Sequence, residues 1–302
     1  MRAAVESRRA ALPGIGRVKP APFDYVRART LDEALAVLDA DSKVLAGGQS
    51  LVPMLNMRLV RPARLVDINA VPGLDGVCAR PDGGVDIGAL IRHSDLLTAP
   101  LVRERAPLLA AAAAHVGHRA IRNRGTIGRS VAHADPAAEL PAALLALDAI
   151  AIIARRGGVR RVALDELFVG ALTTTLQADE ILIGIEIPDA RGAGWGFSEV
   201  ARRPGDFAIA GVAAMARGTR GRCERARLVA FGAHERPVRL RAAEAAITGA
   251  ELSPSLGARA AAHTAADCQP PDDVHASAEY RTHLVRVLTE QAVRDAVLGV
   301  AR

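Results

Sequence analysis

The stretch Lys43-Val-Leu-Ala-Gly-Gly-Gln-Ser-Leu51 runs from a strand-like apolar segment into a glycine pair, and a second glycine-bearing stretch, Thr126-Ile-Gly-Arg-Ser130, follows much later in the chain. Glycine has no Cβ, so its backbone can adopt positive φ and let consecutive amide N–H groups point into one concavity that holds phosphate oxygens. The hydroxyls of Ser50, Thr126 and Ser130 add neutral donors. Together the two stretches predict a split cradle for a diphosphate.

The two stretches match neither of the common phosphate-binding motifs. Residues 46–50 lack the Gly-x-x-x-x-Gly-Lys-Ser/Thr pattern of a P-loop, and neither stretch spells Gly-x-Gly-x-x-Gly after a strand. A P-loop or an ordinary Rossmann domain is therefore disfavoured. A single glycine turn is more often a plain tight loop than a phosphate site, so the prediction depends on the wider context.

That context resembles a known family. The segments that carry the resemblance are Lys43–Arg58, Arg61–Ile68, Ile121–Gly128 and Ala132–Pro141. In this order they resemble the FAD-binding medium subunit of the molybdenum hydroxylases, the family of carbon monoxide dehydrogenase and xanthine dehydrogenase. Residues 197–211 resemble the start of that family's C-terminal domain, so the resemblance extends from about residue 18 to near the C-terminus.

The resemblance implies an α+β fold of the vanillyl-alcohol oxidase type, in which two subdomains hold an extended FAD between them. We expect this FAD-binding domain at residues 18–190, with subdomains at about 18–73 and 74–190. A small α+β C-terminal domain with a three-stranded sheet is expected at residues 191–302. Residues 1–17 have no counterpart in the family and are expected to be a disordered or mis-annotated extension, with Val18 as the alternative initiator.

Local patterns predict alternating helices and strands. Thr30-Leu-Asp-Glu33 is typical of a capping box, and Pro107 should break the helix expected over residues 100–115. The turn-rich stretch 116–136 is expected to be a long loop, which in a compact domain is usually functional or disordered. Further strands are expected at 43–46, 64–68, 84–89, 149–154, 161–163, 180–187, 197–200, 207–215 and 226–232, and helices at 51–57, 94–98, 139–147, 236–247, 253–266 and 276–301.

Composition indicates a cytoplasmic protein. The chain of 302 residues has no apolar run near the roughly 20 residues of a membrane helix, and its first residues lack the apolar core of a secretory signal. Cys78, Cys223 and Cys268 are single and far apart, so they form neither a disulfide framework nor an iron–sulfur ligand set. If the protein takes part in a cluster-linked redox chain, the clusters must belong to a partner.

The charge does not indicate a nucleic-acid partner. The net charge is +6 with a pI near 10.0, but the arginines are scattered and aromatic residues make up only 3% of the chain. Binding of nucleic acid needs clustered cations and stacking surfaces. The arginine pairs on either side of Gly157-Gly158 are better explained as solvated ends of a hairpin.

The resemblance assigns cofactor-binding roles position by position. Glu139 stands where the family places an acidic residue near the cofactor, Val116 where an apolar side chain lines it, and Leu182 where a strand passes it; each would also suit an ordinary helix start or core position. The predicted cofactor-binding residues are Lys43, Val44, Leu45, Ala46, Gly47, Gly48, Gln49, Ser50, Leu51, Val116, Thr126, Ile127, Gly128, Arg129, Ser130, His133, Asp135, Glu139 and Leu182.

No catalytic side chain and no metal site are predicted. His115 and His118 lack a third ligand at a fitting spacing. His133 lies between the second glycine stretch and Asp135, where it serves either the cofactor or simply the local backbone. Flavin itself would carry the electrons, while the protein binds it and tunes its potential.

Arg129 departs from the family pattern, which has a second glycine at this position. A side chain there either cannot follow a backbone with positive φ and fills the diphosphate channel, or places a guanidinium on the phosphates. The aromatic residue that covers the flavin is also open, with Trp195 and Phe197 as the two choices.

Two functions follow from the resemblance. In the first, FAD in this chain receives electrons from a molybdenum-pterin large subunit through an iron–sulfur small subunit and passes them to an external acceptor, in a complex expected to be a dimer of heterotrimers. In the second, the chain is a structural subunit that binds FAD weakly or not at all. The substrate of the complex would be recognised by another polypeptide.

Overall fold

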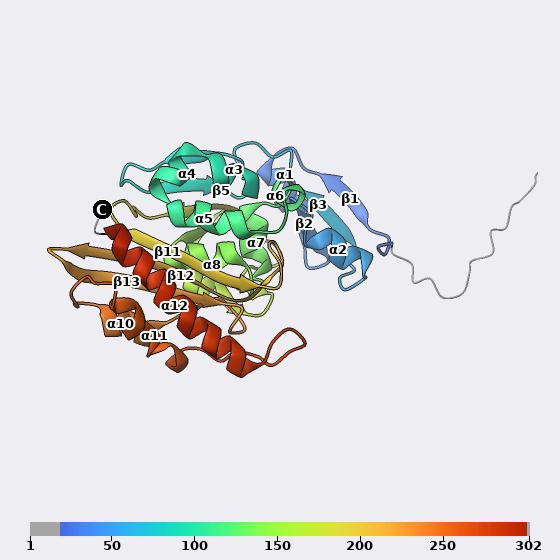
Figure 1. Ribbon diagram of the computed structural model, residues 1–302. Helices are drawn as coiled ribbons and strands as arrows, with labels where there is room; N and C mark the ends of the chain where they lie inside the picture. Colours follow the sequence, from blue (N-terminus) through green and yellow to red (C-terminus); the bar gives the residue numbers. More distant parts are fainter. Residues whose placement is uncertain (1–18, 301–302) are drawn as a thin grey trace, which may run out of the picture.

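The computed structural model describes residues 19–300 (Figure 1). The expectations for residues 1–17 and for Val18 as the initiator therefore lie outside the described residues. The helices and strands fall into three groups along the chain, each built around one main sheet, and a small two-stranded sheet formed by residues 168–170 and 173–174 belongs to the second group.

The first group is a three-stranded parallel sheet in the order β1-β3-β2. Thr30 Oγ1 accepts a hydrogen bond from Glu33 N at 3.1 Å, and the Glu33 carboxylate accepts one from Arg29 N at 2.7 Å, so the predicted capping interaction at the start of α1 is confirmed. The elements are β1 (Asp24–Arg27), α1 (Leu31–Val37), β2 (Ser42–Leu45), α2 (Leu51–Asn56) and β3 (Arg64–Asp67).

The second group is a five-stranded antiparallel sheet in the order β4-β5-β10-β6-β7. Helix α4 ends at Arg105 and α5 begins at Pro107, which confirms the predicted break. The elements are β4 (Val77–Ala79), β5 (Val85–Gly88), α3 (His93–Thr98), α4 (Pro100–Arg105), α5 (Pro107–His115), α6 (Arg119–Arg122), α7 (Ile127–His133), α8 (Glu139–Ala146), β6 (Ile150–Arg155), β7 (Gly158–Ala163), α9 (Leu164–Leu167), β8 (Phe168–Gly170), β9 (Thr173–Thr174) and β10 (Ile181–Ile187).

The expectation of a long loop over residues 116–136 was wrong in part, because the segment contains α6 and α7. Both helices are short, and their sequences mix arginine, glycine and small residues, so they show no apolar periodicity. Tertiary contacts hold them instead: Ile127 N donates to Ile91 O at 3.0 Å, and Ile127 is fully buried.

The third group is a four-stranded antiparallel sheet, one strand more than expected. The additional strand β14 has only two residues, too few for a visible alternation, and pairs with Val229 and Ala230 of β13. Helix α12 lies along β11 and β12 (Figure 1). The elements are β11 (Gly194–Ala201), β12 (Ala208–Thr219), β13 (Arg222–Phe231), β14 (Val238–Arg239), α10 (Arg241–Ile247), α11 (Leu256–Ala261), a 3-10 turn (Thr264–Ala266) and α12 (Ala278–Val300).

Helix α8 connects the second and third groups. All eight of its residues are buried, and its leucines share one apolar cluster with Ile153 of the five-stranded sheet and with Val229 and Phe231 of the four-stranded sheet. The opposite face of the four-stranded sheet packs on α10, α11 and α12 in a separate cluster. The five-stranded and the four-stranded sheets thus pack on the same buried helix.

The first group is joined to the second by apolar contacts and by Arg156. Leu35 and Val66 share a cluster with Ala154 and Ile181, and the Arg156 guanidinium donates to the carbonyl oxygen of Leu35 at 3.1 Å. Between residues 19 and 300, no helix is long and apolar enough to cross a membrane.

Candidate functional site

The two glycine-bearing stretches lie against each other. A Cβ on Gly47 would lie 2.1 Å from the carbonyl oxygen of Arg124, so only glycine permits this contact between the two segments. Gly48 has φ of +75°, a conformation that glycine adopts without strain. The N–H groups of Gly48, Gln49 and Ser50 donate no hydrogen bond to any described residue. The first stretch therefore offers a set of free amides, as predicted for a phosphate cradle.

A chain of hydrogen bonds holds the two stretches in register. Asn69 Nδ2 donates to the carbonyl oxygen of Ala46 at 2.9 Å, and Arg92 Nη2 donates to Asn69 Oδ1 at 2.8 Å. Arg92 Nη1 then donates to the carbonyl oxygen of Arg124 at 3.0 Å. Asn69 and Arg92 thus form a bracket between the first stretch and the residue that precedes the second.

The second stretch differs from the predicted turn. Thr126 is the N-cap of α7, and Gly128, Arg129 and Ser130 lie inside that helix. Gly128 N donates to the carbonyl oxygen of Ala89 at 2.9 Å, so this amide is not free for a phosphate. Gly128 is required because a Cβ would lie 2.5 Å from Ala89 Cβ. One of the two alternatives for Arg129 assumed a backbone with positive φ; the residue is helical instead, and a helical backbone accepts any L-residue there.

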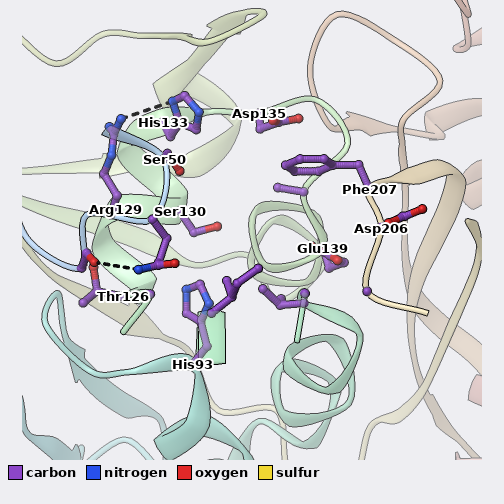
Figure 2. Close-up of a pocket in the computed structure, with 18 residues that line it drawn as sticks. Ser50, His93, Thr126, Arg129, Ser130, His133, Asp135, Glu139, Asp206 and Phe207 are labelled. Atoms are coloured by element: carbon purple, nitrogen blue, oxygen red, sulfur yellow. Dashed lines mark hydrogen bonds between the residues drawn. The ribbon is translucent and has the colours of Figure 1, made fainter. Parts of the chain in front are cut away.

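Two cavities share Arg129 as a lining residue, and Figure 2 shows the first of them. The first cavity has a volume of about 230 Å³ and the second about 120 Å³. Of the predicted residues, the first cavity is lined by Gly47, Gln49, Ser50, Val116, Thr126, Arg129, Ser130, His133, Asp135 and Glu139, and the second by Lys43, Val44, Ala46, Leu51, Gly128, Arg129 and Leu182.

Three predicted residues line neither cavity. Ile127 is fully buried in the main core, Leu45 packs with Leu51 and Leu55 beneath α2, and Gly48 presents only its backbone. Residues that the sequence did not indicate line the first cavity as well, namely His93, Gly117, Ile121, Gly125, Ala138, Gly205, Asp206 and Phe207.

The Arg129 guanidinium has no carboxylate within 4.0 Å among residues 19–300. Its Nη2 lies 3.4 Å from His133 Nδ1, and its Nε is buried without a hydrogen-bond partner. Burial lowers the pKa of Arg129, and burial together with the Arg129 charge lowers the pKa of His133. Thr126 Oγ1 is also buried and unpartnered. A half-buried cation without a counter-ion, beside free amides and an unpaired hydroxyl, fits a diphosphate.

Glu139 begins α8 and is buried at the wall of the first cavity (Figure 2). Burial, together with the nearby Glu199 carboxylate, raises its pKa to about 7, although a hydrogen bond to its own backbone and the positive charge of His115 oppose the shift. His115 Nδ1 lies 3.1 Å from Glu199 Oε1, and this contact raises the pKa of His115. The Glu139 carboxyl can therefore gain or lose a proton near neutral pH.

The aromatic residue at the first cavity is Phe207, in the loop before β12 (Figure 2). Phe197 instead packs on His115 and Phe231, with ring centroids 4.9 Å and 5.6 Å apart, and neither Phe197 nor Trp195 lines a cavity. Phe207 is 68% exposed.

The parallel and antiparallel sheets that meet at these two cavities define a class, the two-subdomain FAD-binding fold of the vanillyl-alcohol oxidase type. Residues 21–190 match the model of the FAD binding domain in molybdopterin dehydrogenase, and residues 195–296 match that of the CO dehydrogenase flavoprotein C-terminal domain. The chain therefore belongs to the family of FAD-binding medium subunits of the molybdenum hydroxylases.

Individual relatives span nearly the whole chain. The 6-hydroxypseudooxynicotine dehydrogenase complex subunit alpha of Paenarthrobacter nicotinovorans is 42% identical over 286 residues, which cover 93% of this chain and 96% of that protein. The carbon monoxide dehydrogenase medium chain of Hydrogenophaga pseudoflava is 33% identical, covering 92% and 98%. The crystal structure of quinoline 2-oxidoreductase from Pseudomonas putida 86 has a chain that is 36% identical with a TM-score of 0.89, covering 94% and 100%.

These comparisons confirm the predicted family and fold class. The chain is an oxidoreductase subunit of the kind found in multi-subunit molybdenum hydroxylases, and FAD is its cofactor.

Proposed function

We propose that this chain is the electron-transfer flavoprotein of a cytoplasmic molybdenum hydroxylase complex. Substrate is oxidised on a molybdenum-pterin large subunit, electrons pass through the iron–sulfur clusters of a small subunit, and they leave through FAD in this chain to an external acceptor. The isolated cysteines at 78, 223 and 268 support the placement of the clusters on a partner. The complex is proposed to be a dimer of heterotrimers.

The observation that carries the proposal is the half-buried guanidinium of Arg129, which lines both cavities and has a buried Nε without a partner. We assign the diphosphate to Arg129, the hydroxyls of Thr126 and Ser130, and the free amides of residues 48–50. The adenosine then fits the smaller, second cavity between Val44 and Leu182. The flavin ring fits the larger, first cavity, where Val116 and Phe207 provide apolar walls.

Bound FAD supplies the redox chemistry; the chain's own residues bind it, orient it and control access to it. Glu139 is placed to hold or release a proton at the flavin end of the cofactor site, because its pKa is about 7. Asp135, Gly205, Asp206 and Phe207 line both the first cavity and a wider groove of about 860 Å³ between the FAD-binding and C-terminal domains. This groove gives the external acceptor a route to the flavin.

The absorbance spectrum of the purified full-length chain tests FAD binding. We expect about one FAD per chain, held non-covalently through the diphosphate site at Arg129 and the free amides of residues 48–50, and released by heat or acid. A folded, colourless chain that stays without flavin after FAD is added would favour the structural-subunit alternative, in which the Arg129 side chain fills the diphosphate position.

The partners are tested by purifying the complex from its native host through a tag on this chain. We expect molybdenum, iron and FAD to elute together, with two further polypeptides in equal amounts. A tagged chain that carries FAD but brings neither metal nor partner would contradict the assembly while leaving the flavin site intact.

A further inference from the structure

His93 is a buried histidine in the first cavity with no assigned role. It is the first residue of α3 and only 6% exposed, and its backbone N–H donates to the carbonyl oxygen of Gly125 at 3.0 Å. Figure 2 shows its side chain directed toward the cavity, below Ser130. A Cβ on residue 125 would lie 2.9 Å from His93 Nδ1, so the glycine leaves room for the ring.

Neither ring nitrogen of His93 has a hydrogen-bond partner of normal geometry in the described part of the chain. Burial lowers the pKa of His93 to about 4, with a smaller contribution from the nearby charges of Arg122 and Arg92, and the backbone of Thr126 only partly opposes the shift. The ring is therefore neutral at physiological pH, with one donor and one acceptor nitrogen. Buried polar groups are almost always hydrogen-bonded. We therefore expect a ligand bound in the first cavity to supply the partner that this ring lacks.

The chemistry of the unpaired ring selects the part of the cofactor that it contacts. A phosphate prefers a cation or free amides, which Arg129 and the first glycine stretch supply. A neutral imidazole that both donates and accepts suits a hydroxyl group, and FAD carries several hydroxyls on the ribityl chain between its diphosphate and its flavin ring. His93 lines only the first cavity, the one assigned to the flavin end.

We propose that His93 is a positioning residue that hydrogen-bonds the ribityl hydroxyls of FAD and so sets where the flavin ring lies in the first cavity. The inference rests on the proposed placement of FAD. It adds a ligand to the half of the site that contacts neither phosphate nor adenosine.

The test compares FAD with ADP, which carries the diphosphate and adenosine but no ribityl chain. His93→Leu should weaken FAD binding by about 3- to 15-fold, the range for one lost hydrogen bond, and leave ADP binding unchanged in calorimetric titrations. His93→Asn, which keeps a donor and an acceptor, should recover part of the FAD affinity. Arg129→Met is the matched contrast, because it should weaken both ligands.

Thermal unfolding of the FAD-free protein separates this role from a structural one. Replacing an unsatisfied buried group by an apolar one should leave the apo-protein as stable as wild type or more stable, while FAD stabilises the variant less. Unchanged FAD affinity in His93→Leu, or equal losses of affinity for FAD and ADP, would overturn the assignment. If the leucine variant does not fold, His93→Asn and His93→Gln allow the same comparison of FAD with ADP. A wild-type chain that binds no FAD would instead contradict the proposed function.

Discussion

Removing the Arg129 charge should weaken FAD binding by a factor that can be estimated from its surroundings. Arg129 is half-buried, its Nε is buried without a partner, and its guanidinium faces no carboxylate among the described residues. Two unit charges about 4 Å apart attract by about 4 kcal/mol at an effective dielectric constant of about 20. Because folding has already taken this arginine out of water, much of its desolvation cost does not recur when FAD binds. Allowing for desolvation of the phosphates, we expect Arg129→Met to cost about 2–3 kcal/mol, or a Kd about 30- to 150-fold higher.

The assay is titration of FAD into apo-protein, followed by flavin fluorescence at low and high salt. Arg129→Met keeps most of the length of the side chain without its charge, and Arg129→Lys should recover part of the affinity. The loss should shrink as salt rises, because the contact is screened. Arg294→Met removes the same charge from an exposed position on α12 and should leave FAD binding unchanged.

The opposite mechanism gives the opposite sign. If the Arg129 side chain crowds the diphosphate, Arg129→Gly should tighten FAD binding. Position 129 is helical, so glycine relieves no backbone strain there and weakens α7 by up to about 1 kcal/mol. Tighter binding by Arg129→Gly at both salt concentrations would refute the assignment of this residue to the phosphates.

The remaining predictions concern the cradle and the buried carboxyl. Gly47→Val should lower both the melting temperature and the FAD affinity, because its Cβ would lie 2.1 Å from the Arg124 carbonyl oxygen. Gly48→Val should lower FAD affinity mainly through backbone strain at φ of +75°. Normal FAD content in both variants would show that the turn is only a loop. Asn69→Ala breaks the bracket to Ala46 and should cost about 1–2 kcal/mol in urea unfolding, together with weaker FAD binding; unchanged flavin affinity would argue against a positioning role. Glu139 has a pKa of about 7 in the folded protein, against an ordinary value of 4.5, so its contribution to stability is complete below about pH 4.5 and is lost as the pH rises through 7. Glu139→Gln should therefore make the apo-protein more stable than wild type at pH 8, by up to about 3 kcal/mol, with no such gain at pH 4; equal stability of both proteins at pH 8 would contradict the buried-carboxyl interpretation.

The features that could be predicted from the sequence are those set by neighbouring residues. The capping interaction of Thr30 with Glu33 and the break at Pro107 depend on contacts within one helical turn, so a local pattern was sufficient. The short helices α6 and α7 and the two-residue strand β14 have no periodicity of their own, because they are held by backbone contacts to distant segments.

The candidate site also contains residues that a local sequence pattern indicates and residues that only the fold brings together. The first glycine stretch was predicted from its own composition, and its unpaired amides agree with that prediction. His93 and Phe207 could not be found in this way, because they reach the first cavity only when α3 and the loop before β12 are brought beside α7. The helical conformation of Arg129 was likewise hidden, because a glycine pair in related sequences suggests a turn where the fold begins a helix.

The complete burial of α8 bears on how such chains can be recombined. The boundary between the two family models, at residues 190–195, is a division of sequence, but the apolar cluster around α8 draws Val229 and Phe231 from beyond it. A fragment ending at residue 190 would present α8 to water along the surface that these residues cover. A chimera that joins this flavin domain to a relative's C-terminal domain would pack α8 against core side chains from a different protein. We therefore expect a swap of the whole chain between related complexes to preserve folding better than a swap of one domain.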